Sequence, residues 1–557
     1  MLPRLAHQIH KLSELTVMKE KVEKQPLRVG LISLGCAKNL VDAEIMLGTL
    51  LKDGVEITND AEQADVVIVN TCSFIDSAQE ESVDAILESA AVRKAHNRGQ
   101  GLVVSGCMTQ RYPDELPKLL PEVDAFMGID QVANITSIVK TALAHRRRRA
   151  NNTVGRASPR ADRSIEELSS QRLAGTLAPP AHIEINRRPI YIPDFATPRF
   201  RLTPRHFAYV KIAEGCNHPC SFCIIPRMRG SHRSRQQQDV IAEAKALIAD
   251  GVKELNLISQ DSTYYGLDLR TNHSRAISAP EKFNAAVKAL PAESTTICTL
   301  LRELNALSGD FWIRLLYTHP AHWTDELIQT MAECSKVARY VDIPLQHIHE
   351  NMLERMRRET SQQYIVDLIR RIRAGIPGIA LRTTFIVGFP GETEEYFENL
   401  LQFIRETKFE RLGIFTYSQE EQTRAGKMAG QIPDKIKKRR RDLAMATQHK
   451  IAVAVAESFV GRTIKVLIEK EASAKELKKA RISSWEHGLI RETDNGAARL
   501  RGNYLVARGE ADAPDIDGRV YVRSPKSDIR SSTFEIGNFA QVRVIAHTDY
   551  DLVADLA

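Results

Sequence analysis

The sequence FAYVKIAEGCNHPCSFC, residues 207–223, joins an apolar run to three closely spaced cysteines. The run is rich in residues that favour β-strands, so it predicts a strand that ends where the cysteines begin. Cys216, Cys220 and Cys223 follow the pattern C-x3-C-x2-C. A structural zinc loop, which closes with four ligands, and ligand-free thiols are the less favoured alternatives. Three thiolates suit a 4Fe–4S cluster better, because they leave one iron open for a small molecule.

The length of the chain bounds its organisation. At 557 residues it is too long for one compact core, so we expect two to four domains. Apolar residues make up 43% of it, and the net charge is +7, most of which lies in basic runs at 145–150 and 435–441. This balance permits a nucleic-acid partner but does not indicate one.

Neither a membrane span nor a secretion signal is predicted. No apolar run approaches the roughly 20 residues of a transmembrane helix, and residues 1–26 lack the apolar core of a signal peptide. We expect a cytoplasmic protein with a loosely ordered extension at 1–26, and with Met1 or Met18 as its start. Structural disulfides are rare in that compartment, so the eight cysteines favour metal binding or catalysis.

Strands alternate with helices in two parts of the chain. Residues 27–144 contain three apolar strands with amphipathic stretches after them, and they predict an N-terminal parallel α/β sheet domain. Residues 207–433 contain six such units, too few for a closed eight-fold barrel. We therefore expect a central partial (β/α)6 barrel with an insertion at 271–300. Its strand candidates are 207–215, 252–261, 311–319, 338–347, 379–389 and 411–419.

The remaining segments have a different composition. Residues 145–206 are rich in Arg and Pro, and they predict a partly disordered interdomain linker. Residues 434–456 predict a basic connecting helix. From 457 to 557, short strands with Gly turns predict a small antiparallel β-barrel of OB-like character. The fold class is therefore α/β multidomain.

Three further cysteines recur at regular spacing. Cys36, Cys72 and Cys107 lie 36 and 35 residues apart, each at the end of a predicted N-terminal strand. The ends of parallel strands share one edge of a sheet, so three thiolates can converge there. Three separate buried thiols are the alternative, but the recurrence favours a second cluster with an open iron. Cys298 and Cys334 fit neither group, and we interpret them as structural.

The C-x3-C-x2-C loop after the first strand of a six-unit domain resembles the radical S-adenosylmethionine superfamily. The resemblance implies a 4Fe–4S cluster whose open iron binds S-adenosylmethionine, which is cleaved to a 5′-deoxyadenosyl radical. It also implies a site at the carboxyl ends of the barrel strands, where we expect Phe222, Gln260 and Gln346 to contact the cofactor. Other polar residues at these ends are Asp261, His319, His347, Glu392 and Ser418.

Two three-cysteine groups followed by a β-barrel resemble the methylthiotransferase family, whose last module is similar to a TRAM domain. The match covers nearly all of residues 27–557. It implies that the N-terminal cluster carries sulfur and that one S-adenosylmethionine methylates this sulfur. A second one, on the other cluster, makes the radical that takes hydrogen from an unactivated substrate carbon. The carbon radical then couples to the methylated sulfur. The cofactors carry this chemistry, so no side chain is expected to act as acid or base.

The family has two substrate classes. RimO-type members modify an aspartate β-carbon of small-subunit ribosomal protein twelve (uS12), and MiaB-type members modify an adenosine beside the tRNA anticodon. Residues 33–44, SLGCAKNLVDAE, resemble the RimO-type GCPKNLVDSE, whereas MiaB-type sequences have Gln-Met-Asn after this cysteine. Within this segment, Ala37 and Ala43 depart from the RimO-type pattern. In a separate segment, Gln422 stands where the family usually has Gly. Further RimO-like segments are NTCSFIDSAQEES (70–82), SQDSTYYGLDL (259–269) and HTDYDLVADL (547–556).

Charge supports the same choice. From 457 to the end, the chain has sixteen Lys and Arg against sixteen Asp and Glu, whereas a domain that grips RNA is usually basic. We therefore expect uS12 as substrate, free or in the assembled subunit, together with a flavodoxin- or ferredoxin-type electron donor and a monomeric enzyme. The alternatives are a tRNA adenosine methylthiotransferase and a non-catalytic iron–sulfur protein that binds RNA or ribosomes.

Overall fold

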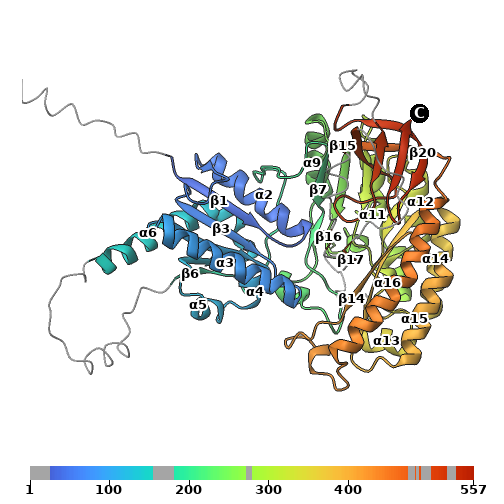
Figure 1. The fold of residues 1–557 in the computed structure, drawn as a ribbon, viewed down its shortest axis with the longest axis horizontal. Coiled ribbons are helices and arrows are strands. Elements are labelled where there is room, and N and C mark those ends of the chain that lie inside the picture. The colour runs from blue at the N-terminus through green and yellow to red at the C-terminus, as the bar shows by residue number, and fades with distance from the viewer. Residues whose placement is uncertain are drawn as a thin grey trace, which may run out of the picture.

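The computed structural model describes residues 26–154, 181–270, 279–473, 483–484, 489–490, 503–523 and 535–557. It contains an N-terminal sheet domain, a central unit of parallel strands and a C-terminal closed barrel. Figure 1 shows the N-terminal unit in blue and cyan, beside the central unit, and the C-terminal barrel in red. The predicted α/β multidomain architecture is confirmed.

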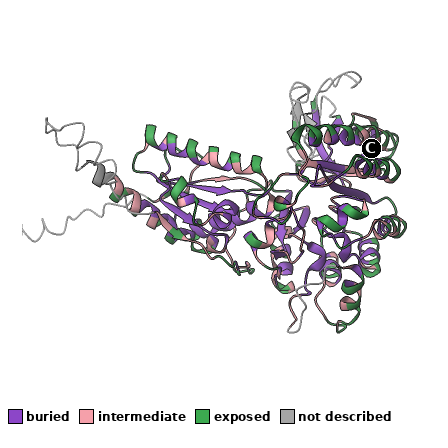
Figure 2. Cartoon of the chain, turned by 90° about the horizontal axis from the view of Figure 1, so that it is seen from below, coloured by how far each residue is buried: buried purple, intermediate pink, exposed green. Residues whose placement is uncertain are grey.

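The N-terminal unit is a six-stranded parallel sheet in the order β2-β1-β3-β4-β5-β6. Val66 and Ile68 pack on one face, while Val67 and Val69 pack on the other, as expected for strands that are covered on both sides. Figure 2 shows these strands as buried. The strands are β1 (Arg28–Ser33), β2 (Glu56–Ile57), β3 (Val66–Thr71), β4 (Gly101–Gly106), β5 (Ala125–Met127) and β6 (His182–Glu184).

Helices cover both faces of this sheet. Helices α2 and α6 contribute to the hydrophobic cluster on one face, and α3, α4 and α5 contribute to the cluster on the other. Among the described helices of the whole chain, none is long and apolar enough to cross a membrane. The helices of this unit are α2 (Ala37–Lys52), α3 (Asp76–His96), α4 (Cys107–Arg111), α5 (Leu116–Leu119), η1 (Ile129–Asn134) and α6 (Ile135–Val154).

The segment predicted as a linker, 145–206, is partly ordered structure. Helix α6 continues through the arginine run to Val154, since arginine is a good helix former, and β6 pairs with β5 as an added edge strand. Arg199 forms ion pairs with Glu44 of the N-terminal unit and with Glu243 of the central unit. Residues 181–206 therefore tie two units together, and 155–180 lie outside the described residues.

The central unit has six parallel strands at the predicted positions. Sheets β11-β10-β7 and β12-β13-β14 meet where the segment after β11 hydrogen-bonds to β12, from Thr318 N to Asp342 O at 3.0 Å. Alternate residues such as Leu255 and Leu257 pack outward against the helices. The strands are β7 (Phe207–Lys211), β10 (Glu254–Ile258), β11 (Trp312–Leu315), β12 (Tyr340–Asp342), β13 (Ala380–Val387) and β14 (Arg411–Thr416).

Helices on the outside connect these strands, and the basic helix predicted at 434–456 is α16. The described part of the insertion holds α10, whose Phe283 stacks on His322. The helices are α8 (Ile225–Arg229), α9 (Gln237–Ala249), η2 (Ser262–Tyr264), α10 (Pro280–Lys288), α11 (Ile297–Ala306), η3 (Pro320–His322), α12 (Asp325–Glu333), α13 (Glu350–Met356), α14 (Gln362–Gly375), α15 (Glu394–Thr407), η4 (Ala425–Lys427) and α16 (Asp434–Glu457). A hairpin pairs β8 (Ala213–Glu214) with β9 (Arg233–Ser234).

The C-terminal unit is a closed barrel in the order β15-β18-β19-β21-β20. Its pairs are antiparallel except that β19 runs parallel to β21, which differs from the purely antiparallel barrel expected from the short strands. The strands are β15 (Thr463–Ser473), β18 (Asn503–Gly509), β19 (Val520–Arg523), β20 (Phe539–His547) and β21 (Leu552–Leu556), with a separate pair β16 (Ser483–Ser484) and β17 (Leu489–Ile490).

Loop 508–518, which comprises the last two residues of β18 and the turn that follows them, packs into the amino-terminal end of the central barrel. Arg508 binds Glu254, which also binds Arg314, with nitrogen–oxygen distances of 2.5 and 2.6 Å. The Tyr340 hydroxyl donates to Asp517 Oδ2 at 2.7 Å. These charged and polar side chains are buried, so each depends on its partner across the two units.

Candidate functional site

The three N-terminal cysteines lie at one edge of the sheet. Cys36 is the N-cap of α2, Cys72 follows β3, and Cys107 begins α4 directly after β4. Strands β1, β3 and β4 are neighbours, so their carboxyl ends bring the thiols together, as predicted from the spacing. Cys72 and Cys107 are buried, and Cys36 is half-buried.

Two glycines let the cysteine loops approach one another. Gly35 and Gly106 each precede a cysteine of this group, and they adopt φ angles of 89° and 95°, which glycine tolerates best. A Cβ atom at Gly35 would lie 2.8 Å from the Cβ of Cys72, and one at Gly106 would overlap the carbonyl oxygen of Thr71. A larger residue at either position would push the strand ends apart.

The environment of these three thiols disfavours their thiolate forms. Burial raises the pKa of Cys72 to about 12, and the Cys107 and Cys36 thiols add to the shift. Burial also raises the pKa of Cys107, which the Arg229 guanidinium at 3.3 Å from Sγ opposes. Crowded thiolates in a poorly solvated site need a metal centre to supply positive charge. The donor set therefore fits a metal cluster.

The C-x3-C-x2-C loop forms a second group of thiols. Cys216 N donates to Gly230 O at 3.1 Å, and Arg358 donates to Cys220 Sγ at 3.4 Å. Burial raises the pKa of Cys216 well above its ordinary value, and the Cys223 thiol adds to this shift. This donor set also fits a metal centre bound through thiolates.

Three histidines form the group of His, Cys, Asp and Glu side chains, within the described ranges, whose ligand atoms all lie within 4.8 Å of one another: His218, His319 and His322.

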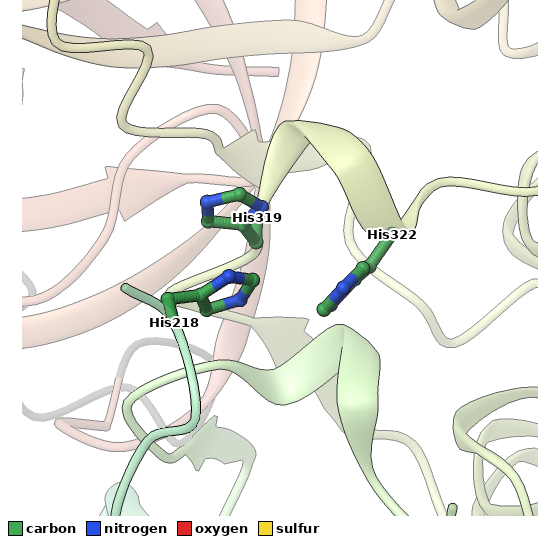
Figure 3. A group of neighbouring side chains, drawn as sticks. All are labelled: His218, His319 and His322. Atoms are coloured by element: carbon green, nitrogen blue, oxygen red, sulfur yellow. The ribbon is translucent and has the colours of Figure 1, made fainter. Parts of the chain in front are cut away.

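His218 ties the cysteine loop to the ends of the next two strands (Figure 3). Its Nε2 lies 2.8 Å from Asp261 Oδ2, which also lies 2.6 Å from His322 Nδ1. The His319 ring stacks on His218 with centroids 3.6 Å apart. The stacked rings of His218 and His319 direct their lone pairs in parallel rather than to one point. The three histidines are therefore better suited to holding the loop in place than to binding a metal ion.

Arg229, in the helix after the cysteine loop, bridges the two cysteine groups. Its guanidinium lies 3.3 Å from Cys107 Sγ and 3.0 Å from both Asp42 and Glu214. Lys211 contacts the same two carboxylates. Arg229 and Lys211 belong to the central unit, whereas Asp42 and Cys107 belong to the N-terminal unit. This buried network therefore fixes one unit against the other.

The predicted cofactor contacts lie beside the cysteine loop. Gln260 follows β10 and donates to Glu214 Oε1 at 2.6 Å. Gln346 follows β12 with a left-handed φ of 74°. The buried Oε1 atoms of both glutamines have no hydrogen-bond partner in the described part of the chain, which suits contact with a ligand. Phe222 is half-buried and packs against the hydrophobic cluster that contains Met352, where it supports the loop.

Other predicted strand-end residues are already paired. Glu392 binds His347 at 3.2 Å and Arg440 at 2.7 Å. The Ser418 hydroxyl lies 3.0 Å from Asp76 Oδ2 of the N-terminal unit. These side chains therefore have a structural role, which could not be predicted from their position at the strand ends.

Three basic residues at the site escaped prediction, namely Lys38, Arg229 and Arg358. Arg229 contacts Asp42, which is 187 residues away in the sequence, and Arg358 contacts Cys220, which is 138 residues away. No local pattern signals such pairs. The available signal was the position of Lys38 and Arg229 within eight residues of a cluster cysteine.

Three family descriptions match the chain. "Uncharacterized protein family UPF0004" matches residues 28–128, "Radical SAM superfamily" matches 210–404, and "TRAM domain" matches 496–556. These correspond to the N-terminal unit, the central unit and the C-terminal barrel.

Curated relatives match along almost the whole chain. The protein named ribosomal protein uS12 methylthiotransferase RimO from Opitutus terrae is 50% identical over 531 residues, which cover 95% of this chain and 96% of that protein. The protein of the same name from Akkermansia muciniphila is 46% identical over 95% of this chain and all of its own length. Among solved structures, the radical S-adenosylmethionine methyltransferase TsrM from Kitasatospora setae matches with a TM-score of 0.46 at 15% identity, covering 72% of this chain and 74% of that chain.

Proposed function

Because this chain belongs to the RimO family of ribosomal protein uS12 methylthiotransferases, we propose that it replaces a hydrogen on the β-carbon of an aspartate in uS12 with a methylthio group. The central unit is a radical S-adenosylmethionine domain. Bound cluster and S-adenosylmethionine supply the radical and sulfur chemistry. The protein's own residues hold these groups and the substrate in place.

The observation that carries the proposal is the meeting of two three-cysteine groups at the junction of two units. Arg229 follows one group in sequence and contacts Cys107 of the other. We propose that Cys216, Cys220 and Cys223 hold the cluster that binds S-adenosylmethionine. Cys36, Cys72 and Cys107 hold a second 4Fe–4S cluster that carries sulfur. One cluster would suffice for radical formation, so the second group favours sulfur insertion.

The remaining residues position the cofactor and its partners. Gln260 and Gln346 each offer an unpartnered amide oxygen to S-adenosylmethionine, and Phe222 supports the loop of the first cluster. The proposed partners are uS12, free or in the assembled subunit, and an electron donor of the flavodoxin or ferredoxin type. The proposed enzyme is monomeric and works in the cytoplasm.

Mass spectrometry of ribosomal proteins and tRNA from a deletion strain tests this function. The expected result is that uS12 loses the net mass that a methylthio group adds when it replaces a hydrogen, and that the wild-type gene restores this mass. A loss confined to tRNA adenosine would replace the proposal with the tRNA-modifying alternative. A reconstituted protein that cleaves no S-adenosylmethionine would instead point to a non-catalytic iron–sulfur protein.

A further inference from the structure

Lys38 is a buried cation beside the N-terminal cysteine group. It is the second residue of α2, two positions after Cys36, and only 7% of it is exposed. Its Nζ lies 2.8 Å from the centroid of the Tyr317 ring, at the end of β11 in the central unit. No carboxylate within the described ranges forms an ion pair with it. A buried ammonium without an anionic partner is costly.

The other basic side chains at this junction form ion pairs with carboxylates. Arg229 and Lys211 share Asp42 and Glu214, so two positive charges meet two negative ones. Asp342, which also lies near Lys38, is paired with Arg382 at 2.8 Å. The carboxylates around Lys38 are therefore each paired with another cation, and the acidic group that attracts the Lys38 ammonium most is the thiol of Cys36.

The residue beneath the ammonium is held in a strained conformation. Tyr317 adopts φ of 59°, a left-handed conformation that is unfavourable for an aromatic residue. Its carbonyl accepts from Ser262 N at 2.9 Å, and its own N–H points to Asp342 Oδ2 at 3.3 Å. Strain of this kind is retained mostly where it shapes a ligand site. It places the ring so that the Lys38 ammonium is held at the junction.

Lys38 is linked to both cysteine groups. It lies two residues after Cys36, and its Nζ contacts Tyr317, which is two residues before His319, whose ring stacks on His218 of the C-x3-C-x2-C loop. A substrate that receives sulfur from one group and loses hydrogen to a radical made at the other has to lie at this junction. We propose that the Lys38 ammonium binds the side-chain carboxylate of the acceptor aspartate. The inference rests on the proposed function and adds a residue that selects an acidic substrate.

A second reading gives the same ammonium a different role. A three-thiolate cluster is anionic, and Lys38 could offset its charge as Arg229 does at Cys107. The two roles predict different effects when Lys38 is replaced by a neutral side chain. The substrate role predicts a loss of discrimination between acidic and neutral acceptors. The cluster role predicts a change in the iron centre with discrimination intact.

The test uses full-length, anaerobically reconstituted protein and two forms of fluorescently labelled uS12, one native and one with the acceptor aspartate replaced by asparagine. Dissociation constants are measured by anisotropy for wild type, Lys38→Met and Lys38→Arg. A charge-assisted contact is expected to make wild type bind native uS12 at least about tenfold more tightly than the asparagine form. That ratio should fall to about one in Lys38→Met and persist in Lys38→Arg. Iron content and the electron paramagnetic resonance spectrum should not change.

Lys38→Gln is the second neutral variant, in case methionine disturbs the packing of α2. The inference is overturned if both neutral variants keep the wild-type ratio, or if they lose iron from the N-terminal group while the ratio persists. Failure of the proposed function is a separate result, because it would leave wild-type protein unable to add a methylthio group to native uS12.

Discussion

Single side chains decide which steps each cysteine group supports. Cys216→Ala should abolish cleavage of S-adenosylmethionine to 5′-deoxyadenosine, because it removes one thiolate from the cluster that binds it. Cys72→Ala should leave that cleavage intact and stop formation of the carbon–sulfur bond. Chromatography of 5′-deoxyadenosine and mass spectrometry of uS12 measure both steps. Sulfur insertion by Cys72→Ala would contradict the role given to the N-terminal group.

Glu469 gives a pH-dependent contribution to stability. Its carboxylate lies 2.7 Å from Arg508 and 3.3 Å from His206. Burial alone would raise its pKa, but Arg508 and His206 lower the pKa from 4.5 to about 2. The folded state therefore holds fewer protons than the unfolded state between these values, so the contribution is complete above pH 4.5 and is lost as the pH falls towards 2.

Glu469→Gln should accordingly destabilise the protein by about 1–3 kcal/mol at pH 7. The gap in melting temperature between the variant and wild type should narrow from pH 5 down to pH 3. Glu471→Gln, at an exposed position of the same strand, is the matched control and should change stability by less than about 0.5 kcal/mol. A gap that stays constant with pH would show that the ion pair is not its source.

At the residue scale, the sequence predicted what depends on residue type and spacing. Cys216, Cys220 and Cys223 were grouped by their local spacing, whereas Cys36, Cys72 and Cys107 were grouped because parallel strands align their carboxyl ends. Lys38 and Arg229 could not be assigned in that way, since their partners Tyr317 and Asp42 are distant in sequence. The inward charges of the barrel strands, such as Arg314, also gave no signal in runs that read as apolar.

At the scale of elements, the turn between β4 and α4 controls the N-terminal cysteine group. Gly106→Ala forces a positive φ on a residue with a Cβ and places that Cβ against the Thr71 carbonyl. We expect this variant to lose about half of the iron that wild type binds, because one of two proposed four-iron clusters would not assemble. Iron analysis after reconstitution measures it.

Gly54→Ala separates backbone strain from the clash. Gly54 also has positive φ, 78°, but nothing lies within 4 Å of the Cβ it would gain. It should cost about 1 kcal/mol of stability and keep the full iron content. Equal iron loss in the two variants would mean that strain alone disrupts the cysteine group.

Strands and helices with a clear hydrophobic periodicity were predictable from the sequence. A very short strand and the extension of a helix beyond its apolar face were not. The six barrel strands and α16 matched the apolar and amphipathic patterns. Strand β6 has three residues and exists because β5 offers an edge to pair with, which no local pattern records. Helix α6 extends into the arginine run because helix propensity outweighs the loss of an apolar face there.

At the scale of the whole molecule, buried ion pairs join the C-terminal barrel to the central unit. Arg508→Met would leave Glu254 with Arg314 as its remaining partner in a buried site. We expect a loss of about 3–5 kcal/mol in the free energy of unfolding. Arg523→Met removes a mostly exposed pair with Asp555 in the same barrel and should cost less than about 1 kcal/mol.

Chemical denaturation of both variants under identical conditions provides the measurement. Equal losses in the two variants would show that the contacts of loop 508–518 do not fasten the units. The charged residues of this contact include Glu254 and Arg314, near the start of neighbouring strands, and they explain why a parallel barrel carries charge on its inner side.

Loop 508–518, which fills the amino-terminal end of the barrel, also affects the order in which ligands can bind. With Ala513 buried in that end, the small cofactor and the ribosomal protein must share the opposite mouth. A large substrate seated there would trap whatever small molecule arrived before it. We therefore expect an ordered sequence of arrivals, with S-adenosylmethionine first and the ribosomal protein last.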